Sequence, residues 1–381
     1  MRVAVNAEQL LYRSPGGIGR YTAALLTLLP AGWPDLEVVP FTARHPTAQV
    51  AGVLREAGVE EPTLGRSVVL GWPRPLLYDS WHLLGRPGLG RAGNVQLIHA
   101  PSVAVPPAGR VPLVVTVHDV APELFPEAFP RRGRRFHRWG LAAAADRADL
   151  VITVSSAAAD EIVAHSAIRA DRIRVVPNAV AGPVVEAELR RRVLQAHGLD
   201  GRRYVLWVGS LEPRKGVGTL VAAMASLARR GKGERVRTVL AGFDGWLGDD
   251  LIAPGDRAAL GDSLVQLGRI SDEVLWCLYS GATLFGFPSR HEGFGLPVIE
   301  AMTQGAPVVA SDIPAVREVA GDAAVLVAPE DPVAWADALE GLLDDEATRA
   351  RMSLAGRERS GHFSVDRWVE STRAVYQEIG S

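Results

Sequence analysis

The chain has 381 residues, of which 48% are apolar and 22% are charged. This composition excludes a disordered chain and provides enough apolar material for two domains rather than one core. The formal net charge is −2, so the overall charge gives no indication of a nucleic-acid-binding protein.

Cysteine content and hydropathy exclude further classes of protein. Cys277 is the one cysteine of the sequence, which excludes an intrachain disulfide and a cysteine-based zinc site. Its apolar neighbours Trp276 and Leu278 predict a buried structural thiol rather than a nucleophile. The sequence has no run of about 18 apolar residues that could span a bilayer, and residues 1–14 indicate a first β-strand rather than a signal peptide. We therefore expect a cytoplasmic protein.

Short β-type runs alternate with amphipathic helical stretches along the first half of the chain. This alternation is typical of parallel sheets covered by helices. The apolar spacing of Ile18, Leu25 and Leu29 predicts the first helix. The expected strands are residues 2–6, 37–41, 96–99, 112–117, 150–154 and 172–176, and the expected helices include 18–29, 129–147 and 156–166.

The alternation resumes in the second half after a break at residues 177–203. Pro177, Gly182 and Pro183 punctuate this segment. It contains a charged helix expected at 186–197, which is followed by Gly198 and Gly201. We place a domain boundary near residue 200, giving domains 1–200 and 201–363. The later strands are expected at 204–208, 236–240, 264–267, 283–287, 307–310 and 323–327, with a last helix at 363–379.

The strongest motif is S-R-H-E-G-F-G-L-P-V-I-E-A-M at residues 289–302, directly after an expected strand. In doubly wound parallel sheets, ligands bind at the carboxyl ends of the strands. Gly293 and Gly295 allow close approach to the backbone, and Pro297 suits the first turn of a helix. The N–H groups of such a helix start can bind phosphate. Glu292 precedes this helix and Glu300 is expected in its first turn, so the two carboxylates could bind sugar hydroxyls and a ribose diol. A glycine-rich turn with a capping glutamate is the alternative.

A second motif, G-S-L-E-P-R-K-G at residues 209–216, also follows an expected strand. Arg214 and Lys215 are adjacent cations beside Gly216, at the expected start of a helix. Only two of the 41 basic residues are lysines, and Lys215 is one of them. An arginine fork next to a lysine point charge suits a diphosphate. A solvated loop pair is the alternative.

Two motifs of the first half are less specific. S-P-G-G-I-G-R-Y (14–21) resembles a dinucleotide fingerprint, but it begins well after its strand, and no acidic residue ends the second strand. We expect Gly17 to line a ligand phosphate or sugar instead. T-V-H-D (116–119) ends a strand and places His118 at the sheet edge. His118 has no second histidine at metal-ligand spacing, so no metal site is expected. A structural histidine is the alternative.

Two further segments admit two interpretations each. Arg269 and Ile270 follow a strand and could border a nucleotide base, although Ser271 could equally be a plain helix cap. The basic and aromatic residues of Arg131–Trp139 begin a helix. They could contact anionic lipid or a lipid-phosphate acceptor, and a solvated helical face is the alternative.

Taken together, the motifs resemble family 4 of the retaining nucleotide-sugar glycosyltransferases. The resemblance extends over nearly the whole chain, and the Glu-x7-Glu spacing around GFGLP is specific to the family. It implies an α/β GT-B fold, in which two Rossmann-like domains with doubly wound parallel sheets face each other across a cleft. In such folds the last helix, here 364–379, packs back on the N-terminal domain. Besides the motifs above, the matching segments are VSSAAADEI (154–162), VVPNAV (175–180), GRISDE (268–273) and PVVASDIPAVREVAGDAA (307–324).

The same resemblance implies roles for individual residues. Arg214 and Lys215 would bind the donor diphosphate. Glu292 would contact the transferred sugar, and Glu300 would bind the ribose. His118 would contact the sugar 6-hydroxyl. The donor would also be bound by Gly17, Arg269, Ile270 and the backbone of Gly293, Phe294, Gly295 and Leu296.

The expected reaction is the metal-independent, cofactor-independent transfer of a hexose with retention of configuration. Two cations and a helix N-terminus would stabilise the leaving diphosphate. H-D at 118–119 and PELFPEAFP at 122–130 look most like mannosyltransferases of the family, which suggests GDP-mannose as donor. Donors of glucose, N-acetylglucosamine, rhamnose or fucose remain open. The expected acceptor is a glycan or a lipid-linked glycan in cell-envelope or polysaccharide synthesis. If Arg131–Trp139 contacts lipid rather than solvent, the protein would lie peripherally on the inner membrane face.

Three other functional classes remain as alternatives. They are an epimerase or a glycogen-synthase-like polymerase that uses the same donor site, a non-catalytic protein that binds sugar nucleotides, and an NAD-dependent oxidoreductase. The complete set of Arg214, Lys215, Glu292 and Glu300 argues against a degenerate protein. The missing context of the dinucleotide fingerprint argues against the oxidoreductase.

Overall fold

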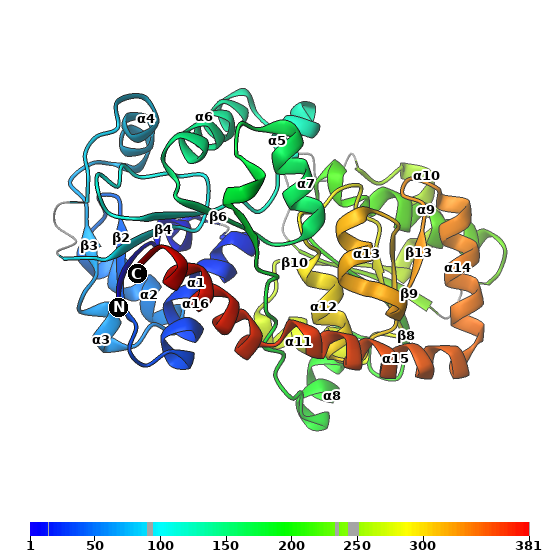
Figure 1. Cartoon of the computed structure of the whole chain (residues 1–381). Helices are drawn as coiled ribbons and strands as arrows, with labels where there is room; N and C mark the ends of the chain where they lie inside the picture. The colour runs from blue at the N-terminus through cyan, green and yellow to red at the C-terminus, as the bar shows by residue number, and fades with distance from the viewer. Residues whose placement is uncertain (14, 90–93, 233–235, 243–250, 381) are drawn as a thin grey trace. The chain divides into compact units, whose positions relative to one another are not determined.

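A computed structural model describes residues 1–13, 15–89, 94–232, 236–242 and 251–380. The chain forms two compact units (Figure 1). The first contains Met1–Ala179 together with Val365–Ser381, and the second contains Val180–Ser364. Each unit has its own parallel sheet and its own core, so each is described by itself.

The first unit is built on a seven-stranded parallel sheet in the order β3-β2-β1-β4-β5-β6-β7. The central strands are buried along their whole length, which explains their continuous apolar sequences. The strand order reverses between β1 and β4, as in other doubly wound sheets. The strands are β1 (Arg2–Asn6), β2 (Glu37–Thr42), β3 (Val68–Val69), β4 (Leu97–Ala100), β5 (Leu113–Thr116), β6 (Leu150–Thr153) and β7 (Ile173–Val175).

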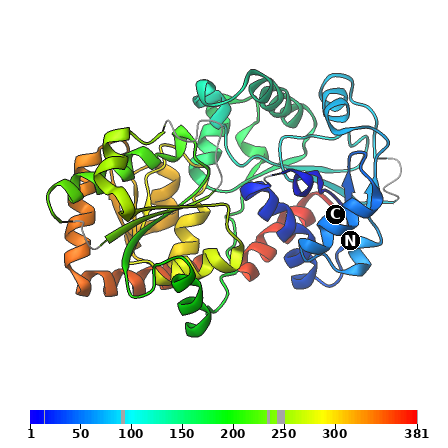
Figure 2. The same cartoon turned by 180° about the vertical axis from the view of Figure 1, so that it is seen from behind.

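Helices cover both faces of this sheet. Helices α1, α2 and α16 pack into one apolar cluster, and α4 and α6 pack into another. The last helix, α16, lies beside α1 (Figures 1 and 2). Its Tyr376 hydroxyl lies 2.6 Å from His99 Nδ1 inside the core. The helices are α1 (Gly16–Gly32), α2 (Thr47–Glu56), α3 (Glu61–Leu64), α4 (Arg74–Leu84), α5 (Ala121–Leu124), α6 (Arg131–Arg147), α7 (Ser156–His165) and α16 (Val365–Gly380).

The second unit has a six-stranded parallel sheet in the order β10-β9-β8-β11-β12-β13. Its order reverses between β8 and β11. The strands are β8 (Arg203–Val208), β9 (Val236–Ala241), β10 (Leu264–Gly268), β11 (Leu284–Phe287), β12 (Val308–Ser311) and β13 (Ala324–Val327). The helices are α8 (Ala187–Ala196), α9 (Val217–Arg229), α10 (Pro254–Leu260), α11 (Asp272–Gly281), α12 (Leu296–Thr303), α13 (Pro314–Ala320), α14 (Pro332–Asp344) and α15 (Glu346–Ser360).

The α/β class with two parallel sheets is confirmed, but the boundary lies at 179/180 rather than near residue 200. Helix α8 belongs to the second unit because it packs on α11. Buried Leu194 of α8 approaches Gly281 so closely that a Cβ there would lie 2.8 Å from the leucine side chain. Gly198 and Gly201 looked like linker residues in the sequence. In the structure both have positive φ angles, and they form the turn between α8 and β8.

Two other expectations concern burial. Cys277 lies buried in α11, as its apolar neighbours predicted. Within the described ranges, no helix combines the length and the apolar character that crossing a bilayer requires.

Candidate functional site

Two loops of the second unit follow the strands at which the sheet order reverses. Residues 209–216 follow β8 and residues 288–295 follow β11. Strands β8 and β11 are paired in parallel, with Val205 opposite Leu284, so their carboxyl ends lie at the same sheet edge. The backbone N–H of Arg290 donates to the carbonyl of Arg214 at 2.8 Å and joins the two loops. This is the place where open α/β sheets bind ligands.

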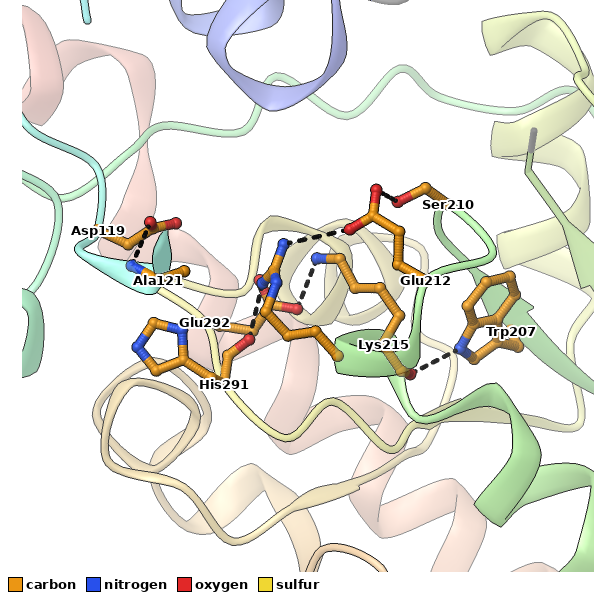
Figure 3. Close-up of polar contacts among 9 residues, drawn as sticks. Asp119, Ala121, Trp207, Ser210, Glu212, Lys215, His291 and Glu292 are labelled. Carbon is orange, nitrogen blue, oxygen red and sulfur yellow. Dashed lines mark hydrogen bonds and ion pairs between the residues drawn. The ribbon is translucent and has the colours of Figure 1, made fainter. Parts of the chain in front are cut away.

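The two loops bring Arg214 and Lys215 to the carboxylate of Glu292. Figure 3 shows Lys215 beside Glu292. Lys215 Nζ donates to Glu292 Oε1 at 2.7 Å. Arg214 Nη1 donates to the carbonyl oxygen of His291 at 2.8 Å and lies 3.4 Å from Glu292 Oε2. The three charged side chains are only 10–16% exposed. The contacts therefore fix two cations around one carboxylate.

Burial and charge act against each other in this cluster. Burial lowers the pKa of Lys215, and the neighbouring Arg214 adds to that effect, while Glu292 opposes it. Burial alone would raise the pKa of Glu292, but the charges of Lys215 and Arg214 outweigh it and hold that pKa below its usual range. Glu292 is therefore ionised at neutral pH and serves as the counter-ion of both cations.

Sequence reasoning missed Glu212 and Ser210, which belong to the same loop. Glu212 Oε2 lies 3.9 Å from Arg214 Nη2, and the Ser210 hydroxyl donates to Glu212 Oε1 at 2.8 Å (Figure 3). Arg214 is therefore held between two carboxylates. Both residues are part of the G-S-L-E-P-R-K-G motif, so an acidic residue two positions before the arginine was the available signal.

Glycines start both helices that follow these loops. Gly216 is the N-cap of α9 and has a φ of 64°, and Gly295 is the N-cap of α12 with a φ of 108°. A Cβ at Gly216 would lie 2.0 Å from the carbonyl oxygen of Pro288, so only glycine allows the loops to approach this closely. Glycine has no side chain that could accept hydrogen bonds from the first-turn N–H groups. Two helix N-termini therefore begin beside the cation pair, an arrangement suited to phosphate.

Glu300 does not occupy the expected first turn of α12. The helix begins at Leu296, and its first turn contains no acidic residue. Glu300 is 4% exposed, and its Oε2 accepts a hydrogen bond from the Tyr279 hydroxyl at 3.0 Å. Phe294 is buried against Phe363 with ring centroids 5.5 Å apart, so its side chain belongs to the core. Of the segment 293–296, the backbone is the part suited to a ligand.

The loop with Arg269 and Ile270 connects β10 to α11. Ser271 caps α11 by accepting from the N–H of Val274 at 3.3 Å, so the alternative interpretation of this serine is realised. Backbone contacts nevertheless join the loop to the same sheet edge. The N–H of Gly242 donates to the carbonyl of Gly268 at 2.8 Å, and a Cβ at Gly242 would lie 1.6 Å from the oxygen of Gly209.

In the first unit, Gly17 and His118 lie on separate elements. Gly17 is exposed in the first turn of α1, and Ser14 of the same motif lies outside the described residues. His118 Nε2 lies 2.9 Å from the carbonyl oxygen of Pro101. A carbonyl only accepts, so Nε2 carries the proton and Nδ1 is the acceptor nitrogen of the neutral ring. Burial lowers the pKa of His118, which favours this neutral form.

Asp119, the residue after His118, is used locally. Its Oδ1 accepts from the backbone N–H of Ala121 at 3.0 Å, at the start of α5 (Figure 3). Across the part of the chain that the structure describes, no group of three or more His, Cys, Asp or Glu residues is arranged to hold a metal ion.

Family models match both halves of the chain. Residues 15–181 match the model described as Glycosyltransferase Family 4, and residues 190–359 match the model described as Glycosyl transferases group 1. The first matched range ends two residues past the boundary at 179/180, and the second range lies wholly within the second unit. Each unit therefore corresponds in the main to one model.

Individual proteins are similar over most or all of the chain. The O-antigen chain mannosyltransferase B of Escherichia coli is 29% identical, with 99% of this chain and 100% of that protein covered. An alpha-D-kanosaminyltransferase of Streptomyces kanamyceticus is 31% identical, with 71% of each protein covered. Among solved structures, Anabaena HepE in complex with UDP and glucose has a TM-score of 0.75 at 20% identity, with 99% of this chain and 100% of that one covered.

Proposed function

This chain belongs to glycosyltransferase family 4 and has the GT-B fold, and we propose that it transfers mannose from GDP-mannose to a glycan or lipid-linked acceptor. The observation that carries the proposal is the cluster of Arg214, Lys215 and Glu292 between two helix N-termini. Such a cluster matches the charge that develops when a nucleoside diphosphate leaves a sugar.

Both cations can donate hydrogen bonds to the leaving group. Lys215 carries three N–H bonds and gives one to Glu292, and Arg214 carries five in a planar fork. The first turns of α9 and α12 add further N–H groups, except those of Thr219 and Val298, which donate to the carbonyls of Gly216 and Gly295, and except Pro297, which has no N–H. Together these groups supply hydrogen-bond donors to the leaving phosphate, which a divalent cation stabilises by its charge in other sites. On this basis we propose transfer that does not depend on a metal.

We propose that the reaction retains the anomeric configuration. As the bond between C1 and the diphosphate oxygen breaks, its electron pair passes to the diphosphate, which Arg214 and Lys215 stabilise. The acceptor hydroxyl then forms its bond to C1 on the same face of the sugar, and its proton passes to an oxygen of the leaving phosphate. Glu292 contacts the sugar hydroxyls in this scheme, and neutral His118 would accept from another sugar hydroxyl through Nδ1.

Mannose is favoured by the full-length similarity to a mannosyltransferase. Similarity to a kanosaminyltransferase and to a structure with UDP and glucose supports a second candidate, a transferase that uses a UDP- or dTDP-sugar. The named role of the first relative in O-antigen chains supports polysaccharide synthesis, which we place in the cytoplasm where nucleotide sugars are made.

Thermal unfolding with GDP, UDP, dTDP and NAD tests the proposal. A ligand at about 100 times its Kd adds roughly 2.7 kcal/mol to the free energy of unfolding. We expect GDP to stabilise the protein and NAD to have no effect. Incubation with GDP-mannose and acceptor should then give an α-linked product by NMR. Selective stabilisation by UDP or dTDP would instead establish the second candidate, and no stabilisation by any diphosphate would reject both.

A further inference from the structure

The first unit contains a cavity of about 340 Å³ that the donor site does not use. Its lining includes Arg74, Arg132, Arg135, Tyr12 and Trp139. These residues come from three segments, each of which follows the carboxyl end of a strand of the first sheet: β1, β3 and β5. Ligand sites of doubly wound sheets lie at this edge. We propose that the cavity binds a phosphate group carried by the acceptor, an inference that rests on the proposed transferase function.

The charges of the cavity favour an anion. Three arginines line it against one acidic residue, Asp79. Asp79 approaches Arg132 only to 3.9 Å, so it neutralises that arginine weakly. Arg74 lies 3.8 Å from the buried Glu8. The carboxylate of Glu8 also accepts from the N–H of Ala43 at 2.9 Å. The net charge of the lining is therefore positive.

Aromatic rings position two of the guanidinium groups. The guanidinium of Arg74 lies over the ring of Tyr12, 4.2 Å from its centroid, and that of Arg135 lies over Trp139 at 4.9 Å. Stacking on a ring face orients an arginine and leaves its N–H groups available at the edge of the plane. Planar, preoriented forks of this kind suit phosphate oxygens.

Two helices begin at the cavity. Arg74 and Pro75 open α4, and Arg132 and Gly133 lie in the first turn of α6. The N-cap residues of both helices are prolines, whose side chains contain no acceptor for the first-turn N–H groups. The two helices also pack together through Tyr78 and Phe136, whose rings stack at 5.7 Å. The positive ends of two helices thus add to the charge of the arginines.

The sequence at these helix starts opposes helix stability. Four of the first five residues of α6 are arginines, and no acidic residue occupies its first turn, although the helix dipole favours acidic side chains there. Gly133 is also unfavourable within a helix. A Cβ at Gly133 would meet only Pro130 at the ordinary distance of 3.6 Å, so packing does not require glycine. An anionic ligand that approaches the backbone of α6 explains both the arginines in its first turn and the glycine at position 133.

Calorimetric titration of the full-length protein with mannose 6-phosphate, in saturating GDP, tests the inference. We expect mannose 6-phosphate to bind at least tenfold more tightly than methyl α-mannoside. Arg132→Gln and Gly133→Leu should each weaken its binding at least tenfold. Their matched controls, Arg138→Gln on the same helix and Gly52→Leu in α2, lie outside the lining and should change it less than twofold.

The same titrations separate this inference from the proposed function. GDP binding in the absence of sugar phosphate reports on the second unit and should be unchanged in all four variants. If the unaltered protein does not bind GDP, the proposed donor site is wrong. The titration with mannose 6-phosphate still tests the cavity in that case, because its lining lies in the first unit. Equal binding of the charged and uncharged sugars, or equal weakening by Arg132→Gln and Arg138→Gln, would overturn the phosphate cavity.

Vesicles distinguish a lipid-borne phosphate from a soluble one. The protein is sedimented with phosphatidylcholine vesicles, with and without phosphatidic acid. Sedimentation that mannose 6-phosphate reverses and Gly133→Leu abolishes assigns the cavity to lipid phosphate, and binding of mannose 6-phosphate without sedimentation assigns it to a soluble acceptor. Sedimentation that neither change affects, together with weak binding of mannose 6-phosphate, would show general attraction of α6 to a membrane and reject the cavity.

Discussion

Lys215 and Glu292 lie 77 residues apart in the sequence, and their charged atoms are 2.7 Å apart in the structure. Each of the two side chains favours the charged form of the other. The lysine and Arg214 keep the pKa of the carboxyl low despite burial, and the carboxylate opposes the effect of burial on the lysine. A diphosphate that binds here meets a cation already placed by an internal counter-ion, so little reorganisation is needed in the transition state.

Replacing Lys215 by alanine should abolish most of the transferase activity. We expect kcat/KM to fall by about 10²–10³-fold, because one preorganised donor to the leaving group is lost. The chain supplies a matched control in its other lysine. Lys232 pairs with Glu340 at 3.1 Å on the surface, and Lys232→Ala should leave turnover near the level of the unaltered enzyme. Similar rates for the two variants would refute the role of Lys215.

Glu292→Gln separates nucleotide binding from transfer. The substitution keeps the shape of the side chain but removes the counter-ion of Arg214 and Lys215. We expect GDP to bind as tightly as before or more tightly, since the cations lose a competing carboxylate, whereas kcat falls by about 100-fold or more. Calorimetry with GDP and initial rates with GDP-mannose measure the two effects. A parallel loss of GDP affinity and kcat would contradict this division of roles.

Much of the fold follows from local sequence patterns. The apolar runs predicted strands at the positions of twelve strands in the structure, within one residue at each end. Strand β3 was missed because it contains two residues, Val68–Val69, too few for a periodic signal. The domain boundary was misplaced because the turn at Gly198 and Gly201 has the composition of a linker. Helix α8 belongs to the second unit because its Leu194 packs against Gly281, a contact that only the tertiary structure shows.

The sequence also predicted part of the candidate site. The sequence placed Lys215 and Glu292 directly after strands of a parallel sheet, but it did not predict the ion pair between them. The placement of Glu300 in the first turn was wrong. The helix begins at Leu296 with Pro297 in its first turn, as expected, so Glu300 is its fifth residue and lies in the second turn. The cavity around Arg74 and Trp139 had only a partial signal in the basic start of α6. Its lining comes from three distant segments, and no local pattern joins them.

The pKa of Glu292 predicts a pH dependence of stability. Its pKa is below the ordinary value of 4.5 in the folded protein, so the unfolded chain binds the proton more readily. The stabilisation is therefore fully present above about pH 4.5 and is lost as the pH falls through the folded pKa. Urea unfolding at about pH 7 should show Glu292→Gln less stable than the unaltered protein by about 1–3 kcal/mol. The difference should shrink at about pH 3, and a constant difference would exclude the linkage.

Gly216→Ala should damage the site through the backbone. Its left-handed φ of 64° and the 2.0 Å approach to the oxygen of Pro288 both exclude a side chain. Gly198 is a matched control, because it has a φ of 66° with no heavy atom within 4 Å of the Cβ position. Gly198→Ala carries only the cost of the left-handed conformation, about 1–2 kcal/mol.

We expect Gly216→Ala to lower the free energy of unfolding by at least about 1 kcal/mol more than this control. It should also weaken GDP binding, because the loops that carry Arg214 and Arg290 must separate to relieve the contact with Pro288. Urea unfolding and calorimetry with GDP measure the two effects. Equal destabilisation by the two alanine substitutions, with GDP affinity unchanged, would show that the close approach of the loops does not hold the cation cluster in place.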